Sequence, residues 1–229
     1  MLTNHRRALW YAGAMLAALA LVFVGVGRHP PGDAPTTTIA FIGRWDQTVY
    51  NWSDDVRNDL LTAIARALSF IGSGVVTIPL RLALAAWLAI RNRWRALVVW
   101  VLTWGVAELA LAMAKPFFHR GRPIGSLVDT VGYSFPSGHA VAAAATAVSL
   151  VLVLMPPGPS RRRWEWAAAI FAFVMASSRV YLRAHWLSDV VAGVLLGTGV
   201  ALGIAALATE IRDRALHVGH HARAPATDA

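Results

Sequence analysis

The chain of 229 residues contains no cysteine, and only 14% of its residues are Asp, Glu, Lys or Arg. Without cysteine it can form neither a disulfide bond nor a thiolate zinc site. So few charges, beside 57% hydrophobic residues and a mean hydropathy of +0.52, are wrong for a soluble domain. The composition therefore predicts a protein whose surroundings are a lipid bilayer.

Long apolar runs are what the sequence has in abundance. A helix needs roughly 20 mostly apolar residues to cross a bilayer, and six stretches qualify or nearly qualify. Because they lack the strict alternation of barrel strands, we predict an all-α membrane protein, a bundle of six transmembrane helices within one domain over 1–211. The predicted spans are about 8–27, 71–90, 95–115, 137–155, 164–182 and 188–209.

The formal net charge of +9 comes largely from arginines at alternate ends of these spans. By the positive-inside rule those ends are cytoplasmic, so the charge indicates orientation, with both termini in the cytoplasm, and not a nucleic-acid partner. No small-x-small cleavage site follows the first span, which is expected to be a retained anchor. Residues 212–229 are expected to form a disordered cytoplasmic tail. The clusters are Arg6 and Arg7, then Arg91, Arg93 and Arg95, then Arg161, Arg162 and Arg163, then Arg212 and Arg214.

The segment between the first two spans begins with Pro30, Pro31, Gly32 and Pro35, which forbid a continuous helix. Further on, Ser53 is expected to cap an amphipathic helix that lies along the outer membrane interface. The glycines at 72 and 74 are expected to end it. Its first turn would hold Asp54 and Asp55, and its apolar face would be formed by Val56, Leu60, Ile64 and Leu68.

Three groups of polar residues fall at the predicted outer ends of the third to sixth spans. The first is Lys115, Arg122 and Pro123, with His119 and Arg120 between them. Lys115 is the only lysine beside twenty arginines. A compact ammonium suits a phosphate oxygen in a tight pocket, and the fork of Arg122 can bond two oxygens. Taken alone, these cations could equally anchor the chain at the interface.

The second group is Pro136, Ser137, Gly138 and His139, at the start of the fourth span. Ser134 is expected to cap that helix, with Pro136 in its first turn. Free N–H groups at a helix N-terminus bind anions, Gly138 lets a phosphate approach the backbone, and the Ser137 hydroxyl adds a donor. On its own, a helix start with a chance histidine would read in the same way.

The third group is Ser178 and Arg179, followed by His185 and Asp189 at the start of the sixth span. Four residues apart on a helix, His185 and Asp189 share one face. A carboxylate that holds the proton of one imidazole nitrogen leaves the other nitrogen free to attack, and Arg179 can neutralise phosphoryl oxygens. A surface hydrogen bond is the ordinary alternative for this pair.

Together the three groups supply what phosphoryl transfer needs, which is charge neutralisation, a nucleophile and a general acid. They contain no carboxylate cluster suited to magnesium. In these residues the chain resembles the type 2 phosphatidic acid phosphatase family, whose motifs are Lys-x6-Arg-Pro, Pro-Ser-Gly-His and Ser-Arg-x5-His-x3-Asp. The motifs occur in family order, over 115–123, 136–139 and 178–189.

The resemblance implies a histidine mechanism without metal or cofactor. By that likeness His185 is the nucleophile that forms a phosphohistidine, Asp189 orients it, and His139 protonates the leaving oxygen. Soluble vanadium haloperoxidases share this pocket, but six spans disfavour that branch. The likeness also implies that the phosphate is held by Lys115, Arg122, Ser137, Gly138 and Arg179.

Charged and small residues inside the predicted spans give two further expectations. Arg81 and Glu108 are costly in a bilayer without a partner, so we expect them to pair beneath the site and support it. In the sixth span, glycines recur at small-xxx-small spacing, which permits close helix contact within the bundle or, less favoured, in a dimer. These glycines are Gly193, Gly197, Gly199 and Gly203.

The predicted function is hydrolysis of a membrane lipid phosphate or diphosphate at the outer face of a bacterial plasma membrane. The outward site and analogy favour undecaprenyl diphosphate as the substrate. Phosphatidic acid and phosphatidylglycerophosphate fit as well, because the motifs contact only phosphate. A protein of a different class, which binds or transports an anionic lipid without hydrolysis, stays an alternative.

Overall fold

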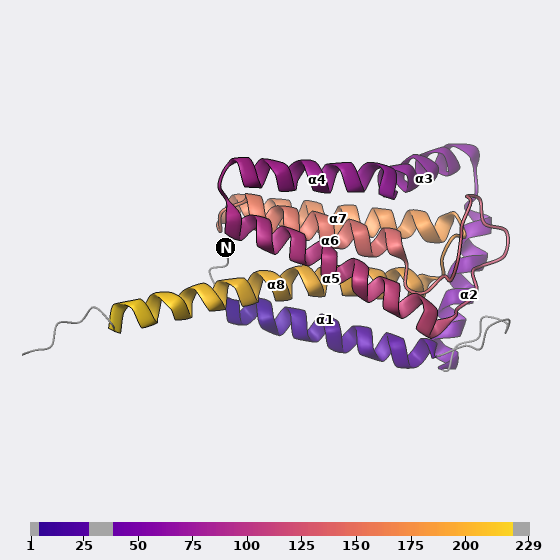
Figure 1. The fold of residues 1–229 in the computed structure, drawn as a ribbon. Coiled ribbons are helices and arrows are strands. Elements are labelled where there is room, and N and C mark those ends of the chain that lie inside the picture. The colour runs from indigo at the N-terminus through magenta and orange to yellow at the C-terminus, as the bar shows by residue number, and fades with distance from the viewer. Residues whose placement is uncertain (1–4, 28–38, 222–229) are drawn as a thin grey trace, which may run out of the picture.

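The computed structural model describes residues 5–27 and 39–221, and within them it contains helices and no strands. The all-α prediction is confirmed. The proline-rich stretch over 30–35 lies outside the described residues. The helices, labelled in Figure 1, are α1 (His5–Val26), α2 (Ala40–Asp55), α3 (Asp59–Ile71), α4 (Gly74–Ile90), α5 (Trp94–Phe118), α6 (Gly138–Leu154), α7 (Pro159–Tyr181) and α8 (Leu187–His221).

Membrane-spanning helices are present, as predicted. By length and composition, α1, α5 and the Leu187–Leu216 part of α8 are able to cross a membrane, and α3 with α4, bent by 41°, makes a fourth candidate. The helix α6 is apolar but shorter, and α7 begins with three arginines. The chain is therefore an integral membrane protein, but a count of six spans does not follow from helix length and composition.

The long helices α1 and α4 to α8 run side by side, while α2 crosses their ends (Figure 1). We call the end covered by α2 the site end. The other end, where α4 turns into α5 and α6 into α7, is the arginine end, because the four arginine clusters flank it. Helix α6 lies at the centre of the bundle, and its alanine-rich sequence is buried over most of its surface.

The predicted interfacial helix is two helices, and its cap was placed wrongly. Ser53 is buried in the last turn of α2, where its Oγ donates to the carbonyl of Tyr50 at 2.6 Å. Helix α3 is capped by Asn58, whose side chain accepts from the N–H of Leu61 at 2.9 Å. Both Ser and Asn are good caps, so local preference could not choose between them. The expected break falls at Gly72, the C-cap of α3.

The glycines of α8 allow close contact with two different helices. A Cβ atom on Gly193 would lie 2.8 Å from the carbonyl oxygen of Ser137, just before α6, and one on Gly197 would lie 2.6 Å from that of Val141 in α6, whereas Gly199 and Gly203 face Leu16 and Ala12 of α1. Contact within the bundle, the favoured expectation, is therefore observed for both pairs. Because the first two of these glycines face only backbone atoms and the methyl groups of Ala140 and Ala144, the two helices that start at the site are held close together.

The predicted intramembrane ion pair is confirmed. Arg81 Nη1 of α4 lies 2.8 Å from Glu108 Oε1 of α5. Arg81 is buried and also donates to the Thr146 hydroxyl of α6 at 3.0 Å, and its carbonyl accepts from Trp100 Nε1 at 3.0 Å. The pair therefore connects three helices below the site.

Helix α8 continues beyond the predicted end of the last span. Disorder was expected from residue 212 onward, yet the helix extends to His221; residues 222–229 lie outside the described part. Glu210 bonds to Arg214 one turn later at 2.8 Å and to His5 of α1 at 2.7 Å. Such pairs stabilise helical turns that composition alone does not predict.

Candidate active site

His185 and Asp189 come close together at the site end, as the sequence predicts, but the expectation that both lie on one helix was wrong for His185, because α8 begins only at Leu187. His185 lies in the connection between α7 and α8, and Asp189 is in the first turn of α8. Nδ1 of His185 is 3.4 Å from Oδ2 of Asp189, within ion-pair distance but without the geometry of a hydrogen bond, and both side chains are buried. The same oxygen accepts from the N–H of Trp186 at 2.9 Å, which fixes the carboxylate at the helix start.

The neighbour of the other ring nitrogen identifies the tautomer of His185. Nη1 of Arg122 lies 3.3 Å from Nε2 of His185. Because a guanidinium only donates, Nε2 must offer its lone pair, and the ring hydrogen must be on Nδ1, facing Asp189. In this state Nε2 of His185 carries no hydrogen, and its electron pair faces the guanidinium of Arg122.

Burial lowers the pKa of His185 to about 4, which outweighs the contact and the charge of Asp189 that raise it. The charges of Arg122 and Arg179 lower it further. Protonation would have to add a charge in a dry pocket that already faces two guanidinium groups. The imidazole is therefore neutral, and able to act as a nucleophile, across the physiological pH range.

Carbonyl oxygens of the α5–α6 connection hold the first predicted cation group. Arg122 donates to the carbonyls of Gly132 and Val131, both at 2.9 Å, and to that of Ala184 beside His185 at 2.7 Å. Lys115 Nζ donates to the carbonyl of Tyr133 at 2.8 Å, and Arg122 Nη2 reaches the same oxygen at 3.3 Å. The shared acceptor brings the two cations together, as expected.

The second group begins α6, but two details of its predicted start were wrong. Ser137, not Ser134, is the N-cap residue, and the hydroxyl of Ser134 donates to the Gly121 carbonyl at 3.0 Å. Pro136 precedes the cap and is outside the helix. The N–H of Ser137 donates to the Asp189 carbonyl at 3.0 Å, so it is not available to a phosphate. This backbone bond ties the second motif to the third.

An aromatic cluster sets the approach to α6. Phe135 is fully buried, and its ring centroid lies 4.7 Å from that of Phe118 and 5.4 Å from that of Phe23. Gly138, the first residue of α6, has a further reason to be glycine, because a Cβ there would lie 3.3 Å from the Leu111 side chain. Its predicted role in phosphate approach stays a prediction.

Sequence reasoning missed Ser69 in α3, which contacts two predicted site residues. Its carbonyl lies 3.1 Å from Nε2 of His139, and its hydroxyl accepts from Nη1 of Arg179. A carbonyl only accepts, so Nε2 of His139 carries hydrogen and Nδ1 is the nitrogen left for proton exchange. We call Ser69, His139 and Arg179 the front group. Ser178 is outside it, since its hydroxyl bonds to the carbonyl of Met175 at 2.7 Å.

A second missed set lies behind Asp189. Arg120 Nη1 donates to Asp189 Oδ1 at 2.5 Å and to the Ser188 hydroxyl at 2.7 Å, while Nη2 donates to Asp46 Oδ2 of α2 at 2.6 Å. Ser188 completes the contacts of Asp46 through its N–H at 2.8 Å and its hydroxyl at 2.7 Å. We call Asp46, Arg120, Ser188 and Asp189 the rear network.

The rear network is dry and charged. The exposed fractions of Asp46, Arg120 and Asp189 are 3%, 1% and 0%. Burial lowers the pKa of Arg120, but attraction to Asp189 and Asp46 outweighs it, so that the pKa lies above its ordinary value. The guanidinium is therefore charged in every functional condition.

Several polar atoms near His185 are buried without a hydrogen-bond partner. Among the described residues they include the hydroxyl oxygen of Ser137 and Nε of Arg179. Buried polar groups in proteins are normally bonded, so donors of this kind at a helix start and on a guanidinium fit an anion. No group of three or more His, Asp or Glu side chains in the described residues is arranged to hold a metal ion.

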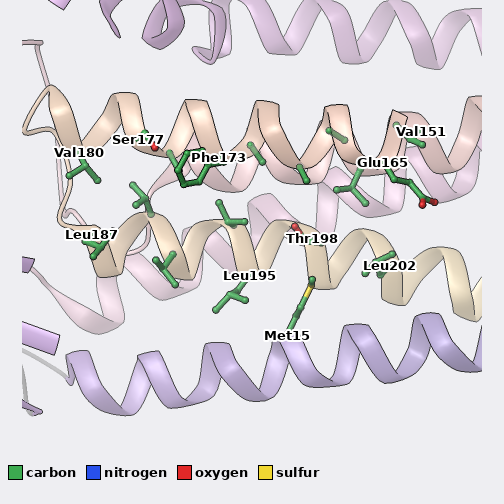
Figure 2. A pocket seen from close by; sticks show the side chains of 18 of the residues that line it. Met15, Val151, Glu165, Phe173, Ser177, Val180, Leu187, Leu195, Thr198 and Leu202 are labelled. Atoms are coloured by element: carbon green, nitrogen blue, oxygen red, sulfur yellow. The ribbon is translucent and has the colours of Figure 1, made fainter. Parts of the chain in front are cut away.

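Of two large cavities among the described residues, one is lined by predicted site residues and the other is not. A groove of about 690 Å³ runs between α7 and α8, past Phe173, Leu195 and Met15 of α1 (Figure 2), but no predicted site residue lines it. A smaller cavity of about 420 Å³, between α4, α5 and α6, is lined by Gly138 and His139. The smaller cavity therefore reaches the front group at His139.

Comparison with known proteins agrees with this geometry. The family model of the PAP2 superfamily matches residues 7–213. Phosphatidylglycerophosphatase B of Bacillus subtilis (strain 168) is 29% identical over 148 residues, which are 62% of this chain and 72% of that protein.

Two solved structures share the fold. The transmembrane PAP2 type phosphatidylglycerolphosphate phosphatase from Bacillus subtilis has a TM-score of 0.73 and 21% identity, over 90% of this chain and 97% of that one. Aquifex aeolicus LpxE has a TM-score of 0.56 and 23% identity, over 70% and 93%. The chain belongs to the PAP2 superfamily, and it is an integral membrane hydrolase of phosphate esters.

Proposed function

We propose that the protein removes the terminal phosphate of a membrane lipid through a phosphohistidine at His185. One observation carries this proposal. Nε2 of His185 carries no hydrogen and lies 3.3 Å from Nη1 of Arg122, the charge of Arg179 is close enough to lower the pKa of His185, and the Ser137 hydroxyl and Nε of Arg179 are buried donors without a partner. A nucleophile surrounded by anion-binding groups is the arrangement that phosphoryl transfer requires.

In the first step, the Nε2 electron pair of His185 forms a bond to phosphorus while the bond from phosphorus to the lipid oxygen breaks. The hydrogen on Nδ1 stays on the ring, so the imidazole becomes positively charged, and Asp189 stabilises that charge. For this step His139 must first take a proton from solvent on Nδ1, which the negative charge of a bound phosphate favours, and it then gives that proton to the departing oxygen. The products of this step are the lipid alcohol and the phosphoenzyme.

In the second step, water attacks phosphorus and His139, now neutral, takes its proton. The bond between phosphorus and Nε2 breaks, and His185 recovers its electron pair as phosphate leaves. Lys115, Arg122 and Arg179 neutralise the phosphoryl oxygens in both steps, with the first-turn N–H groups of α6 at Gly138. No step needs a metal ion.

For the membrane arrangement, we propose that α1 and α4 to α8 all cross the bilayer, six passes in total. Helix α6 has 17 residues, about 25 Å of helix, and it is short because its start is drawn to the site inside the bundle. The arginine clusters at the opposite end favour a cytoplasmic arginine end and an outward-facing site. Both described ends of the chain would then be cytoplasmic.

The cavity at His139 supports a glycerolipid monophosphate as the substrate. Besides apolar residues it is lined by Thr77, Arg81, Trp104 and Glu108, which could face the polar part of a glycerolipid. Together with the similarity to phosphatidylglycerophosphatase B, this favours phosphatidylglycerophosphate. The sequence favoured undecaprenyl diphosphate, but its apolar chain has no polar groups to contact these polar residues. It is kept in the test as the second substrate.

The deciding experiment measures phosphate release by the purified protein in detergent with excess chelator. Phosphatidylglycerophosphate, phosphatidic acid and undecaprenyl diphosphate are compared, beside a His185→Ala variant. We expect metal-independent release, fastest from phosphatidylglycerophosphate, and loss of turnover in the variant. A pulse of ³²P-labelled substrate should label His185 with the acid-labile, base-stable bond of a phosphohistidine.

Each part of the proposal can fail separately. Release that stops with chelator contradicts the mechanism, and faster release from undecaprenyl diphosphate contradicts the substrate assignment. Lipid binding without release from any of the three lipids would favour the non-hydrolytic alternative. In that case His185→Ala would change affinity and leave no turnover to compare.

A further inference from the structure

The residue that needs an explanation is Asp46, a carboxylate on the inner face of α2. Phe41, Trp45 and Trp52 on the same helix are more than half exposed, as anchors at a membrane interface are, whereas Asp46 is 3% exposed. Burying a carboxylate costs several kcal/mol, and an apolar side chain would dock α2 at least as well. The attachment of α2 alone therefore does not account for Asp46.

All the contacts of Asp46 belong to the rear network. Its Oδ1 accepts from the N–H of Ser188 and its Oδ2 accepts from Ser188 Oγ and Arg120 Nη2. The other end of the Arg120 guanidinium holds Asp189 at 2.5 Å. Asp46 is thus one guanidinium away from the carboxylate that faces His185, although α2 contributes no residue to the phosphate pocket.

The charges of the network explain why a second carboxylate is needed. Arg120 alone with Asp189 would form a neutral pair, and Asp189 would have no net charge to offer His185. With Asp46 included, two carboxylates and one guanidinium carry a net charge of −1. In the phosphoenzyme the ring of His185 carries one positive charge. The rear network and this ring together are then neutral.

We propose that Asp46 is a positioning residue that compensates the charge of Arg120, so that Asp189 can stabilise the cationic form of His185. This inference rests on the proposed function, because it requires His185 to become positively charged during turnover. It assigns to α2, a helix outside the phosphate pocket, control over the step that forms the phosphoenzyme. The phosphate-binding cations are left unchanged by it.

The test compares two inhibitors in Asp46→Asn, which keeps the shape of the side chain and removes its charge. Orthovanadate can form a fifth bond to Nε2 and so resembles the transition state, whereas inorganic phosphate binds only through the pocket cations. We expect kcat to fall about 10- to 100-fold and the Ki of vanadate to rise by a similar factor. The Ki of phosphate and the KM should stay within about two-fold. An inhibition constant does not depend on the fraction of folded enzyme, so misfolding cannot imitate this pattern.

Two further variants make the result decisive. Asp55→Asn removes the same charge from an exposed position on α2 and should change neither inhibition constant. Asp46→Asn with Arg120→Gln restores the net charge of −1 through Asp189, so it should recover part of the vanadate affinity lost in the single variant. If the single variant does not fold, the double variant is compared with wild type alone, and a vanadate-to-phosphate ratio within about ten-fold of wild type is expected.

Other results would overturn the inference. Unchanged vanadate inhibition in Asp46→Asn would do so, as would equal weakening of vanadate and phosphate. If the vanadate affinity of the double variant is no higher than that of the single variant, hydrogen bonding and not charge is what matters. The same follows if only the double variant can be measured and its vanadate-to-phosphate ratio of Ki values differs more than ten-fold from that of wild type. Wild-type turnover and its loss in His185→Ala are measured first, so failure of the proposed function is distinguished from failure of this inference.

Discussion

Behind His185, the rear network holds Asp189 among side chains that are at most 6% exposed, whereas in front of it His139 faces a cavity and is held by one carbonyl oxygen. Each side is reached by one helix of the site end, α2 through Asp46 and α3 through Ser69. The rear network is closed because its geometry need not change in a reaction cycle. The front must admit and release a lipid, so its contacts are few.

The largest loss of activity is expected from a substitution in the rear network. Asp189→Asn should lower kcat about 10³- to 10⁴-fold, because the amide can present its N–H to Nδ1 and favour the wrong tautomer of His185. Folded yield should also fall, since Arg120 would lose one of its two buried carboxylate partners. Phosphate release per folded molecule is the measurement. A loss below ten-fold would show that the carboxylate does not govern the nucleophile.

The next effect separates front from rear by the leaving group. His139→Ala should lower the rate about 10²- to 10³-fold for a lipid phosphate, whose alkoxide needs a proton. With p-nitrophenyl phosphate, whose leaving group needs none, the loss should be less than about ten-fold. Asp189→Asn, in contrast, should slow both substrates alike. Equal losses for both substrates in His139→Ala would remove the general-acid role.

A third variant tests the ion pair of Arg81 and Glu108, which lines the cavity at His139. It asks whether removing one charge there destabilises the fold, as is expected in the rear network. Glu108→Gln leaves Arg81 buried without a countercharge and should lower stability by about 2–3 kcal/mol, measured as thermal unfolding in detergent. The double variant with Arg81→Gln should recover at least half of this loss. No recovery would mean that the two charges act independently.

The smallest effect concerns the packing of His139. A Cβ on Gly72 would lie 2.7 Å from Sδ of buried Met175 and 3.1 Å from Cδ2 of His139, so Gly72→Ala should cost about 1–3 kcal/mol and lower activity. Gly74→Ala is the matched control, because its Cβ would meet only Ile78 at an ordinary 3.4 Å. Equal behaviour of the two variants would show that the front tolerates displacement.

The same comparison explains how far the sequence could lead. His185 and Asp189 are four residues apart at the start of α8, and the residues of α6 and of the α5 end stand at helix boundaries, so local spacing predicted which of them would meet, although His185 lies just before the helix and not on it. Their contacts at the site end follow from the fold, while their chemical roles stay predictions. The pair of Arg81 and Glu108 was found because charges inside apolar runs need partners.

Asp46 and Ser69 could not be found in this way. Each is an ordinary polar residue on an amphipathic helix, and its partners lie far away along the chain. Arg120 was noticed only as one cation among several between Lys115 and Arg122. A signal was present in the aromatic neighbours of Asp46, since an acid among interface anchors indicates an inward-facing partner. The caps at Ser53 and Ser134 failed because serine is equally suited to close a turn or to bond a distant carbonyl.

The contact of α8 with α6 has a consequence for how the enzyme can vary. Where Gly193 and Gly197 meet α6, backbone touches backbone, and the Ser137 N–H reaches the Asp189 carbonyl directly. The spacing between the nucleophile and the phosphate-binding turn is thus set by main-chain atoms and not by side-chain volume. Substitutions elsewhere in the apolar core can therefore adapt the protein to membranes of different thickness without changing the distance between the nucleophile and the phosphate-binding turn.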